Sequence, residues 1–293
     1  MPHTEVELVL DARATLGEGP CWDPRSNRLY WVDIRGCDVH EFDPATGRDR
    51  AIRVPRHVGC VVLRETGGAL VALQDGLAEL DLGTGQLTPI VNPEPGRADI
   101  LFNDGKCDPA GRFWVGTKAY ANTPGAGSLY CLDTDRTVRR RLPDVTISNG
   151  LAWSLDARRM YYIDSMAGEV SVFDYDAASG AIANRRTAAR IPRGMGVPDG
   201  MTIDAEGKLW VALWGGHRVV RLDPDTGNCL ETVPMPVTCP SSCCFGGRGL
   251  DELYITSAWI ELQPEARAAE PAAGGLFRCR PGVRGLPPFY FRG

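Results

Sequence analysis

A short strand-like pattern recurs six times along this chain, and this repeat constrains its fold more than any other feature. Each copy combines aromatic or large aliphatic residues with smaller apolar ones, and the copies occupy residues 29–33, 69–72, 113–116, 160–164, 209–212 and 253–256. The equivalent anchor residues are Trp31, Leu70, Trp114, Tyr162, Trp210 and Tyr254. Their separations of 39, 44, 48, 48 and 44 residues match the period of four-stranded propeller blades.

A second pattern marks the turns between strands. In four repeats a further strand ends in Asp and leads into a turn. These strand ends, with the turn residues that follow them, lie at residues 42–47, 80–85, 173–176 and 222–227. Asp and Pro open such turns and Gly closes them, so these segments are expected at hairpins between the outer strands of the blades. We found one helix-like run, near residues 261–269, and it is short.

These patterns predict an all-β fold, a single six-bladed β-propeller with four-stranded antiparallel blades that spans residues 1–293 as one domain. Nothing in the composition divides the chain. The ring must close, because open sheet edges pair with other chains. Either residues 276–279 or residues 6–10 are expected to supply the closing strand.

Charge and composition exclude some partners. The chain has 32 Lys and Arg against 37 Asp and Glu, a net charge of −5, which is the wrong sign for neutralising nucleic-acid phosphates. It contains no membrane-length apolar run and no secretory signal pattern. We therefore expect a cytoplasmic protein, a monomer or weak dimer, that binds neither nucleic acid nor membrane. The ten cysteines are widely spaced and are expected to be reduced thiols rather than a disulfide framework.

One position before each anchor is polar in most repeats. Loops that enter the innermost strands of a propeller face its central channel, so equivalent positions should converge. Counting back 11 to 13 residues from the anchors gives Glu18, Asn103, Asn149, Asp199 and Cys243, and the second repeat offers only Gly59 or Cys60. Asn-Gly and Asp-Gly also form ordinary hairpin turns. However, four residues with side-chain oxygens occupy equivalent positions of their repeats, and this favours a shared polar site. Such oxygens suit Ca²⁺, Mg²⁺ or Mn²⁺, and Zn²⁺ less typically.

Several longer segments then carry a family resemblance over essentially the whole chain. Residues 16–20, 102–112, 147–154, 198–212 and 241–247 strongly resemble the regucalcin branch of the gluconolactonase (sugar lactone lactonase) family. The resemblance implies a six-bladed propeller with one divalent metal held by Glu18, Asn149 and Asp199. It also implies hydrolysis of sugar-acid lactones. Ca²⁺ is the first choice of metal, with Zn²⁺, Mn²⁺ and Mg²⁺ as alternatives.

The chain departs from the family pattern at two substrate positions. Members that hydrolyse aldonolactones typically carry Arg at the position of Leu101 and a carboxylate near the position of Ala121, whereas Asn103, the third contact, is kept. We expect weaker binding of gluconolactone-like substrates and better use of less polar lactones or esters. Residues 118–127 are expected either to close over the channel, with Tyr120 or Lys118 replacing the lost contacts, or to be a plain surface loop.

The expected chemistry is hydrolysis by a metal-activated water. Asp199 is the candidate general base, and Asn103 would orient the substrate or donate to the developing negative charge. Asp104 either orients a metal-bound water or is simply a turn residue. No Gly-x-Ser-x-Gly nucleophile elbow occurs. His217 is expected in a solvated loop rather than in the channel, and Cys243 at the channel wall rather than in a metal clip with Cys239 and Cys244.

Two other classes of function stay open. The same metal centre could hydrolyse other esters or phosphotriesters. Alternatively, the propeller could be a calcium-binding regulator or an interaction platform without catalysis. An interaction propeller has no reason to place Glu, Asn, Asn and Asp on its axis, whereas a metal-dependent hydrolase of a small-molecule lactone requires such a set.

Overall fold

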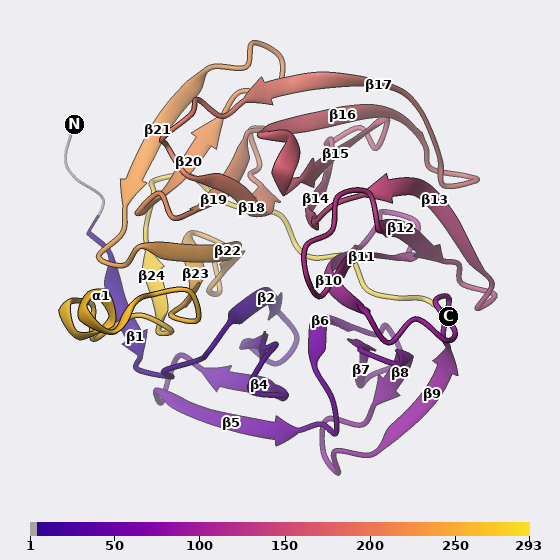
Figure 1. Ribbon diagram of the computed structural model, residues 1–293, viewed down its shortest axis with the longest axis horizontal. Helices are drawn as coiled ribbons and strands as arrows, with labels where there is room; N and C mark the ends of the chain where they lie inside the picture. The colour runs from indigo at the N-terminus through magenta and orange to yellow at the C-terminus, as the bar shows by residue number, and fades with distance from the viewer. Residues whose placement is uncertain (1–4) are drawn as a thin grey trace.

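The computed structural model describes residues 5–293, which form six four-stranded antiparallel sheets arranged in a ring (Figure 1). The predicted six-bladed propeller is therefore confirmed. Within each of the first five blades the strands follow one another from the axis outward. All six innermost strands consequently begin at one end of the central channel, here called the entry mouth, and end at the other, the far mouth.

The strands group by their position in the blade, in blade order from one to six. The innermost are β2 (Gly17–Asp23), β6 (Val58–Leu63), β10 (Ile100–Cys107), β14 (Ser148–Trp153), β18 (Val197–Ile203) and β22 (Cys239–Gly246). The second strands are β3 (Arg28–Asp33), β7 (Ala69–Leu73), β11 (Phe113–Ala119), β15 (Arg159–Asp164), β19 (Leu209–Trp214) and β23 (Glu252–Ala258). The third are β4 (Asp38–Asp43), β8 (Gly76–Leu80), β12 (Gly127–Leu132), β16 (Glu169–Asp176), β20 (Arg218–Leu222) and β24 (Leu276–Cys279). The outermost are β5 (Arg48–Arg53), β9 (Leu87–Val91), β13 (Val138–Val145), β17 (Ala181–Arg190), β21 (Cys229–Pro234) and β1 (Glu7–Leu10).

All six anchor residues lie in the second strands and are buried. These strands are covered on both faces by the neighbouring blades, which explains why their sequences are nearly continuous apolar runs rather than alternating ones. Trp114, for example, packs edge-to-face on Trp153 of the next blade with ring centroids 6.1 Å apart. Trp210 meets Phe245 of its neighbour at 5.9 Å. The core is thus a set of apolar clusters between blades.

Three of the predicted Asp turns lie between the third and fourth strands of their blades, whereas residues 173–176 end the third strand β16 and the turn follows at 177–180. In the second blade, Oδ1 of Asp81 accepts hydrogen bonds from the backbone N–H groups of Gly83 at 2.9 Å and Thr84 at 2.7 Å. Asp43 caps its turn in the same way, accepting from Ala45 at 2.9 Å. These side chains substitute for missing backbone partners at the tips of the hairpins.

Both candidate closing segments take part in ring closure. β24 is the third strand of the sixth blade, and β1, from the other end of the chain, pairs antiparallel with it as the outermost strand. An ion pair between Arg278 and Glu7, at 2.8 Å, reinforces this pairing. The first described strand is therefore fastened to the last, and the ring has no gap.

The helical content is small, as expected. Helix α1 covers Pro264–Ala269 and begins three residues later than predicted, because its proline takes the first-turn position that prolines favour. A 3₁₀ turn, η1 (Ser165–Ala167), was not predicted. All ten cysteines are free thiols, as expected. Among residues 5–293 we find no helix long and apolar enough to cross a membrane.

Candidate metal centre

Every innermost strand has an irregular register near its channel-facing start. The pairing with the second strand shifts between Glu18 and Cys21, Val58 and Val61, Phe102 and Gly105, Ser148 and Leu151, Pro198 and Met201, and Pro240 and Ser242. A β-bulge of this kind leaves residues outside the ladder and redirects their side chains. The six bulges explain why one sequence position recurs around the channel.

The predicted polar residues lie at these bulges. Glu18 directly precedes the bulge of β2, whereas Asn103, Asn149 and Asp199 lie within the bulges of β10, β14 and β18. Glu18, Asn149 and Asp199 are all buried. Three different blades therefore each supply one of the three proposed ligands.

The buried carboxyl groups act on one another electrostatically. Burial raises the pKa of Glu18 well above its ordinary value, and the negative charges of Asp199 and Asp104 raise it further. Burial also raises the pKa of Asp199, with Asp104 acting in the same direction and the ammonium of Lys118 opposing it. Three buried carboxyl groups thus share one region with two lysines, because Lys106 acts on Asp104 while Lys118 acts on the other two.

Hydrogen bonds fix the two amides. Nδ2 of Asn103 donates both to Oδ1 of Asn149 and to the backbone oxygen of Ser148, each at 2.8 Å. Nδ2 of Asn149 donates to Oγ of Ser165, also at 2.8 Å. Because both Nδ2 protons of Asn103 are used, this side chain can offer substrate only its oxygen, as an acceptor. The expected donation from Asn103 to a developing charge does not fit this arrangement.

The donor set fits a hard divalent cation. The carboxylate of Asp199 forms no hydrogen bond or ion pair within residues 5–293, and Glu18 accepts only one, from the N–H of Gly19 at 3.0 Å. Buried charges are costly unless they are paired or bind a metal. Two carboxylates and an amide oxygen are ligands that Ca²⁺ and Mg²⁺ prefer. In the described part of the chain no cluster of three or more His, Cys, Asp or Glu is arranged for a metal, so this mixed set is the candidate.

The predictions for Cys243 and His217 have different outcomes. Cys243 was expected at the channel wall, but it pairs regularly with Ile255 and its Sγ donates to the backbone oxygen of Trp210 at 3.4 Å, within the apolar layer between blades. The bulge of β22 places Ser241 nearer the start of the strand instead. The count from the anchor was wrong because the bulge position differs in this blade. His217 lies exposed in a loop, as expected.

The predicted substrate residues lie at the entry mouth. Leu101 is buried in β10 and pairs with Lys118 of β11. Tyr120 and Ala121 are exposed in the turn that follows. The predicted loop at 118–127 is shorter than expected, because Lys118 and Ala119 belong to β11 and Gly127 begins β12.

Sequence reasoning missed two residues at this mouth. The guanidinium of Arg35, in the turn between β3 and β4, lies over the ring of Tyr120 at 4.3 Å from its centroid. The ring of His57, just before β6, is stacked at 6.3 Å from the same ring. Neither residue belongs to a repeated motif, so no periodic signal could have found them.

A cavity of about 580 Å³ opens toward the far mouth. The carboxyl-terminal halves of the innermost strands line it, together with residues 286–289 near the C-terminus. Asp104 also lines this cavity while its charge acts on Glu18 and Asp199. Its role toward a metal-bound water stays a prediction.

Comparisons with known proteins agree with this architecture. The family model described as "SMP-30/Gluconolactonase/LRE-like region" matches residues 16–259. Regucalcin from Gallus gallus is 43% identical over 299 residues, covering all of both chains.

Solved structures give the same result. A luciferin-regenerating enzyme superposes with a TM-score of 0.93 at 34% identity, over 99% of this chain and 100% of the other. A regucalcin from Agrobacterium tumefaciens, described as a calcium-binding protein, has a TM-score of 0.94 at 29% identity, over 99% of this chain and 98% of the other.

Proposed function

Because the chain belongs to the SMP-30/gluconolactonase/LRE-like family, we propose that it is a divalent-metal-dependent hydrolase that opens lactones. The observation that carries this proposal is the convergence of Glu18, Asn149 and Asp199 from three blades at the channel. The buried, poorly compensated carboxylates of Glu18 and Asp199 are the feature that a bound cation would stabilise. The proposed ion is Ca²⁺, with Zn²⁺, Mn²⁺ and Mg²⁺ as alternatives.

In this proposal Glu18, Asn149 and Asp199 hold the ion, which supplies Lewis acidity toward the lactone carbonyl and acidifies water. Asp199 accepts no hydrogen bond from residues 5–293, so one of its oxygens remains available to take the proton of the attacking water. Asn103 accepts a substrate hydroxyl through Oδ1, and its donated bonds keep Oδ1 of Asn149 in place. The side chain of Asp104 lies on the side of the site that faces the far-mouth cavity.

The test is turnover of a panel of lactones after chelation and after restoring each ion separately. We expect chelation to abolish hydrolysis and one ion to restore it. Asp199→Asn should lower kcat/KM by about 10²–10⁴-fold, the usual contribution of a general base. Glu18→Gln and Asn149→Ala should weaken metal binding, measured by calorimetry. Asp81→Asn, in an exposed turn, is the control that should behave like wild type. Unchanged turnover in Asp199→Asn would refute this mechanism.

Two alternatives are decided by the same panel. Phosphotriesters and simple esters are included because the metal centre could polarise them equally well, and preference for either would replace the lactonase proposal. A calcium-binding regulator would bind Ca²⁺ through Glu18 and Asp199 without turning over any member of the panel. The calcium-binding relative makes this second alternative worth measuring.

A further inference from the structure

Two cationic side chains at the entry mouth, those of Arg35 and Lys118, form no direct ion pair with a carboxylate in the described part of the chain. Within residues 5–293, neither the guanidinium of Arg35 nor the ammonium of Lys118 forms an ion pair or donates a hydrogen bond. Nε and Nη1 of Arg35 are moreover buried without an acceptor. Arg97, by contrast, forms a two-pronged ion pair with Asp99, with both distances 2.9 Å.

The two cations act electrostatically on each other, and Lys118 acts on the carboxylate cluster. After burial and the charge of Asp199, the charge of Arg35 has the next largest effect on the pKa of Lys118, and it lowers that pKa. Lys118 in turn acts on both Asp199 and Glu18. A line of groups therefore runs from the carboxylates through Lys118 to Arg35, at the mouth through which a substrate would enter.

Tyr120 covers the outer end of this line. Its ring lies on the Arg35 guanidinium and beside the His57 ring, yet 53% of Tyr120 is exposed, in the turn after β11. An aromatic face stabilises a cation, but it does not accept hydrogen bonds from N–H groups that lie in the guanidinium plane. The buried N–H groups of Arg35 therefore have no acceptor. A planar guanidinium with free N–H groups matches an oxyanion, which it can bind through two parallel hydrogen bonds.

We propose that Arg35 and Lys118 form a binding site for an oxyanion substituent of the substrate. This inference rests on the proposed lactonase function, and it makes the preferred substrates lactones that carry a carboxylate or a phosphate. The apolar Leu101 removes one charged donor from this mouth, and Arg35 supplies another from a different blade. Tyr120 moves aside when the anion enters and packs against the bound molecule afterwards.

The experiment compares one lactone ring carrying a neutral hydroxymethyl, a carboxylate or a phosphate ester, in wild type, Arg35→Gln, Arg35→Lys and Arg97→Gln. We expect wild type to favour one or both anionic lactones in kcat/KM. Losing a charge-assisted hydrogen bond costs roughly 10- to 100-fold, so Arg35→Gln should reduce the ratio of anionic to neutral kcat/KM by that factor, mainly through KM. Arg35→Lys should retain part of the ratio, and Arg97→Gln should leave it unchanged. The carboxylate and phosphate arms identify the anion.

Two results would overturn the proposal. In the first, wild type has the same kcat/KM for the neutral lactone as for the anionic lactones. In the second, Arg35→Gln lowers kcat/KM for all three lactones by the same factor. Thermal denaturation checks that each variant is folded. If no lactone is hydrolysed at all, calorimetric titration with unreactive neutral and carboxylated lactams separates the two ideas. Arg35-dependent binding of the carboxylated lactam keeps the anion site while the lactonase proposal fails, and equal binding of both lactams rejects the anion site.

Discussion

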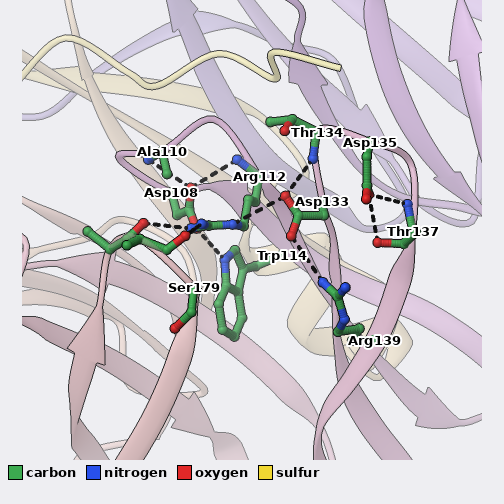
Figure 2. A network of polar contacts seen from close by, with 12 residues as sticks. Asp108, Ala110, Arg112, Trp114, Asp133, Thr134, Asp135, Thr137, Arg139 and Ser179 are labelled. Atoms are coloured by element: carbon green, nitrogen blue, oxygen red, sulfur yellow. Dashed lines mark hydrogen bonds and ion pairs between the residues drawn. The ribbon is translucent and has the colours of Figure 1, made fainter.

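Asp108 illustrates how a single buried carboxylate joins two blades (Figure 2). Its Oδ1 accepts from the backbone N–H groups of Ala110 and Arg112, both at 2.9 Å. Its Oδ2 accepts from the indole of Trp114 at 2.8 Å and from the hydroxyl of Tyr175, in the next blade, at 2.6 Å. The guanidinium of Arg112 completes the set with an ion pair at 3.2 Å. The turn between β10 and β11 depends on this network.

Asp108→Asn should destabilise the protein by about 3–5 kcal/mol, the usual effect of removing one member of a buried ion pair. An amide cannot accept at its nitrogen, so at least one of the two donors to Oδ2, the indole of Trp114 or the hydroxyl of Tyr175, would stay buried without a partner. The guanidinium of Arg112 would also lose its buried negative partner, although its bonds to the backbone oxygens of residues 177 and 178 would remain. Urea denaturation followed by tryptophan fluorescence measures the loss. Asp135→Asn is the matched control, because Asp135 is exposed and bonds only within its own turn. Similar stabilities for the two variants would contradict the role given to Asp108.

The carboxylate cluster makes a second prediction about stability. Folding raises the pKa of both Glu18 and Asp199, so the folded state holds their protons more tightly than the unfolded state does. The metal-free protein should therefore lose stability as pH rises from the ordinary carboxyl range through the raised pKa values of the folded state. Asp199→Asn removes one charge, so in chelator it should be more stable than wild type at pH 8, although its kcat/KM is lowered.

Denaturation in chelator at pH 6 and pH 8, for wild type and Asp199→Asn, measures this effect. The advantage of the variant should shrink at pH 6 and should disappear when the correct metal is restored to wild type. A metal-free wild type whose stability rises between pH 6 and pH 8 relative to Asp199→Asn would show that the carboxylates are not in electrostatic conflict. Asp81→Asn again serves as the control outside the channel.

At the residue scale the sequence was informative only where a position repeats. Glu18, Asn103, Asn149 and Asp199 could be predicted as channel residues because propeller geometry places one phase of every repeat on the axis. Their roles as ligands remain a proposal. Arg35 could not be predicted, because a single Arg in a turn gives no pattern, and its importance comes from neighbours in other blades.

At the scale of elements, the innermost strands set the geometry of the site through their bulges and their close approach. β6 offers glycine where other innermost strands offer a polar side chain. A Cβ on Gly59 would lie 2.4 Å from the backbone oxygen of Phe102 and 2.6 Å from that of Asn103, in β10. The missing oxygen ligand in the second repeat therefore has a physical reason: the neighbouring strand leaves no room for a side chain.

Gly59→Ala should force β10 away from β6 and should destabilise the protein by about 1–3 kcal/mol, as overpacking typically does. Because Asn103 lies on the displaced strand, kcat/KM for the best lactone should fall as well. Gly83→Ala, in an exposed turn where the nearest atom lies 3.3 Å from the added carbon, is the matched control. Wild-type stability in Gly59→Ala would show that β6 and β10 tolerate a wider spacing.

The elements themselves were predictable to different degrees. The second strands could be predicted because burial on both faces makes them apolar throughout. The outermost strands could not, since β17, for instance, is mostly exposed and has the composition of a polar loop. The position of each bulge was also hidden, because a bulge changes the count of residues without changing their type, and this is why Cys243 was misplaced.

At the scale of the whole molecule, the last residues cross the far mouth and connect blades that are distant in sequence. The yellow chain end in Figure 1 runs from the sixth blade toward the second and third. The N–H of Gly285 donates to Leu250 at 2.7 Å, that of Phe291 to Leu63 at 2.9 Å, and that of Arg292 to Gly111 at 3.0 Å. This segment also lines the 580 Å³ cavity. It acts as a second closure of the ring, separate from the β1–β24 pairing.

Phe291 is the residue through which this second closure contributes most to stability, because its side chain is 1% exposed within the apolar cluster of the second and third blades. Phe291→Ala should cost about 3–5 kcal/mol, the usual range for Phe-to-Ala changes in a core. Phe289, in the same segment, is 41% exposed, so Phe289→Ala is a matched control that should cost far less. Equal losses would mean that the segment does not fasten the ring. The entry mouth lies at the opposite end of the channel, so kcat/KM measured well below the unfolding temperature should stay near the wild-type value in both variants, which separates closure of the ring from the chemistry of the site.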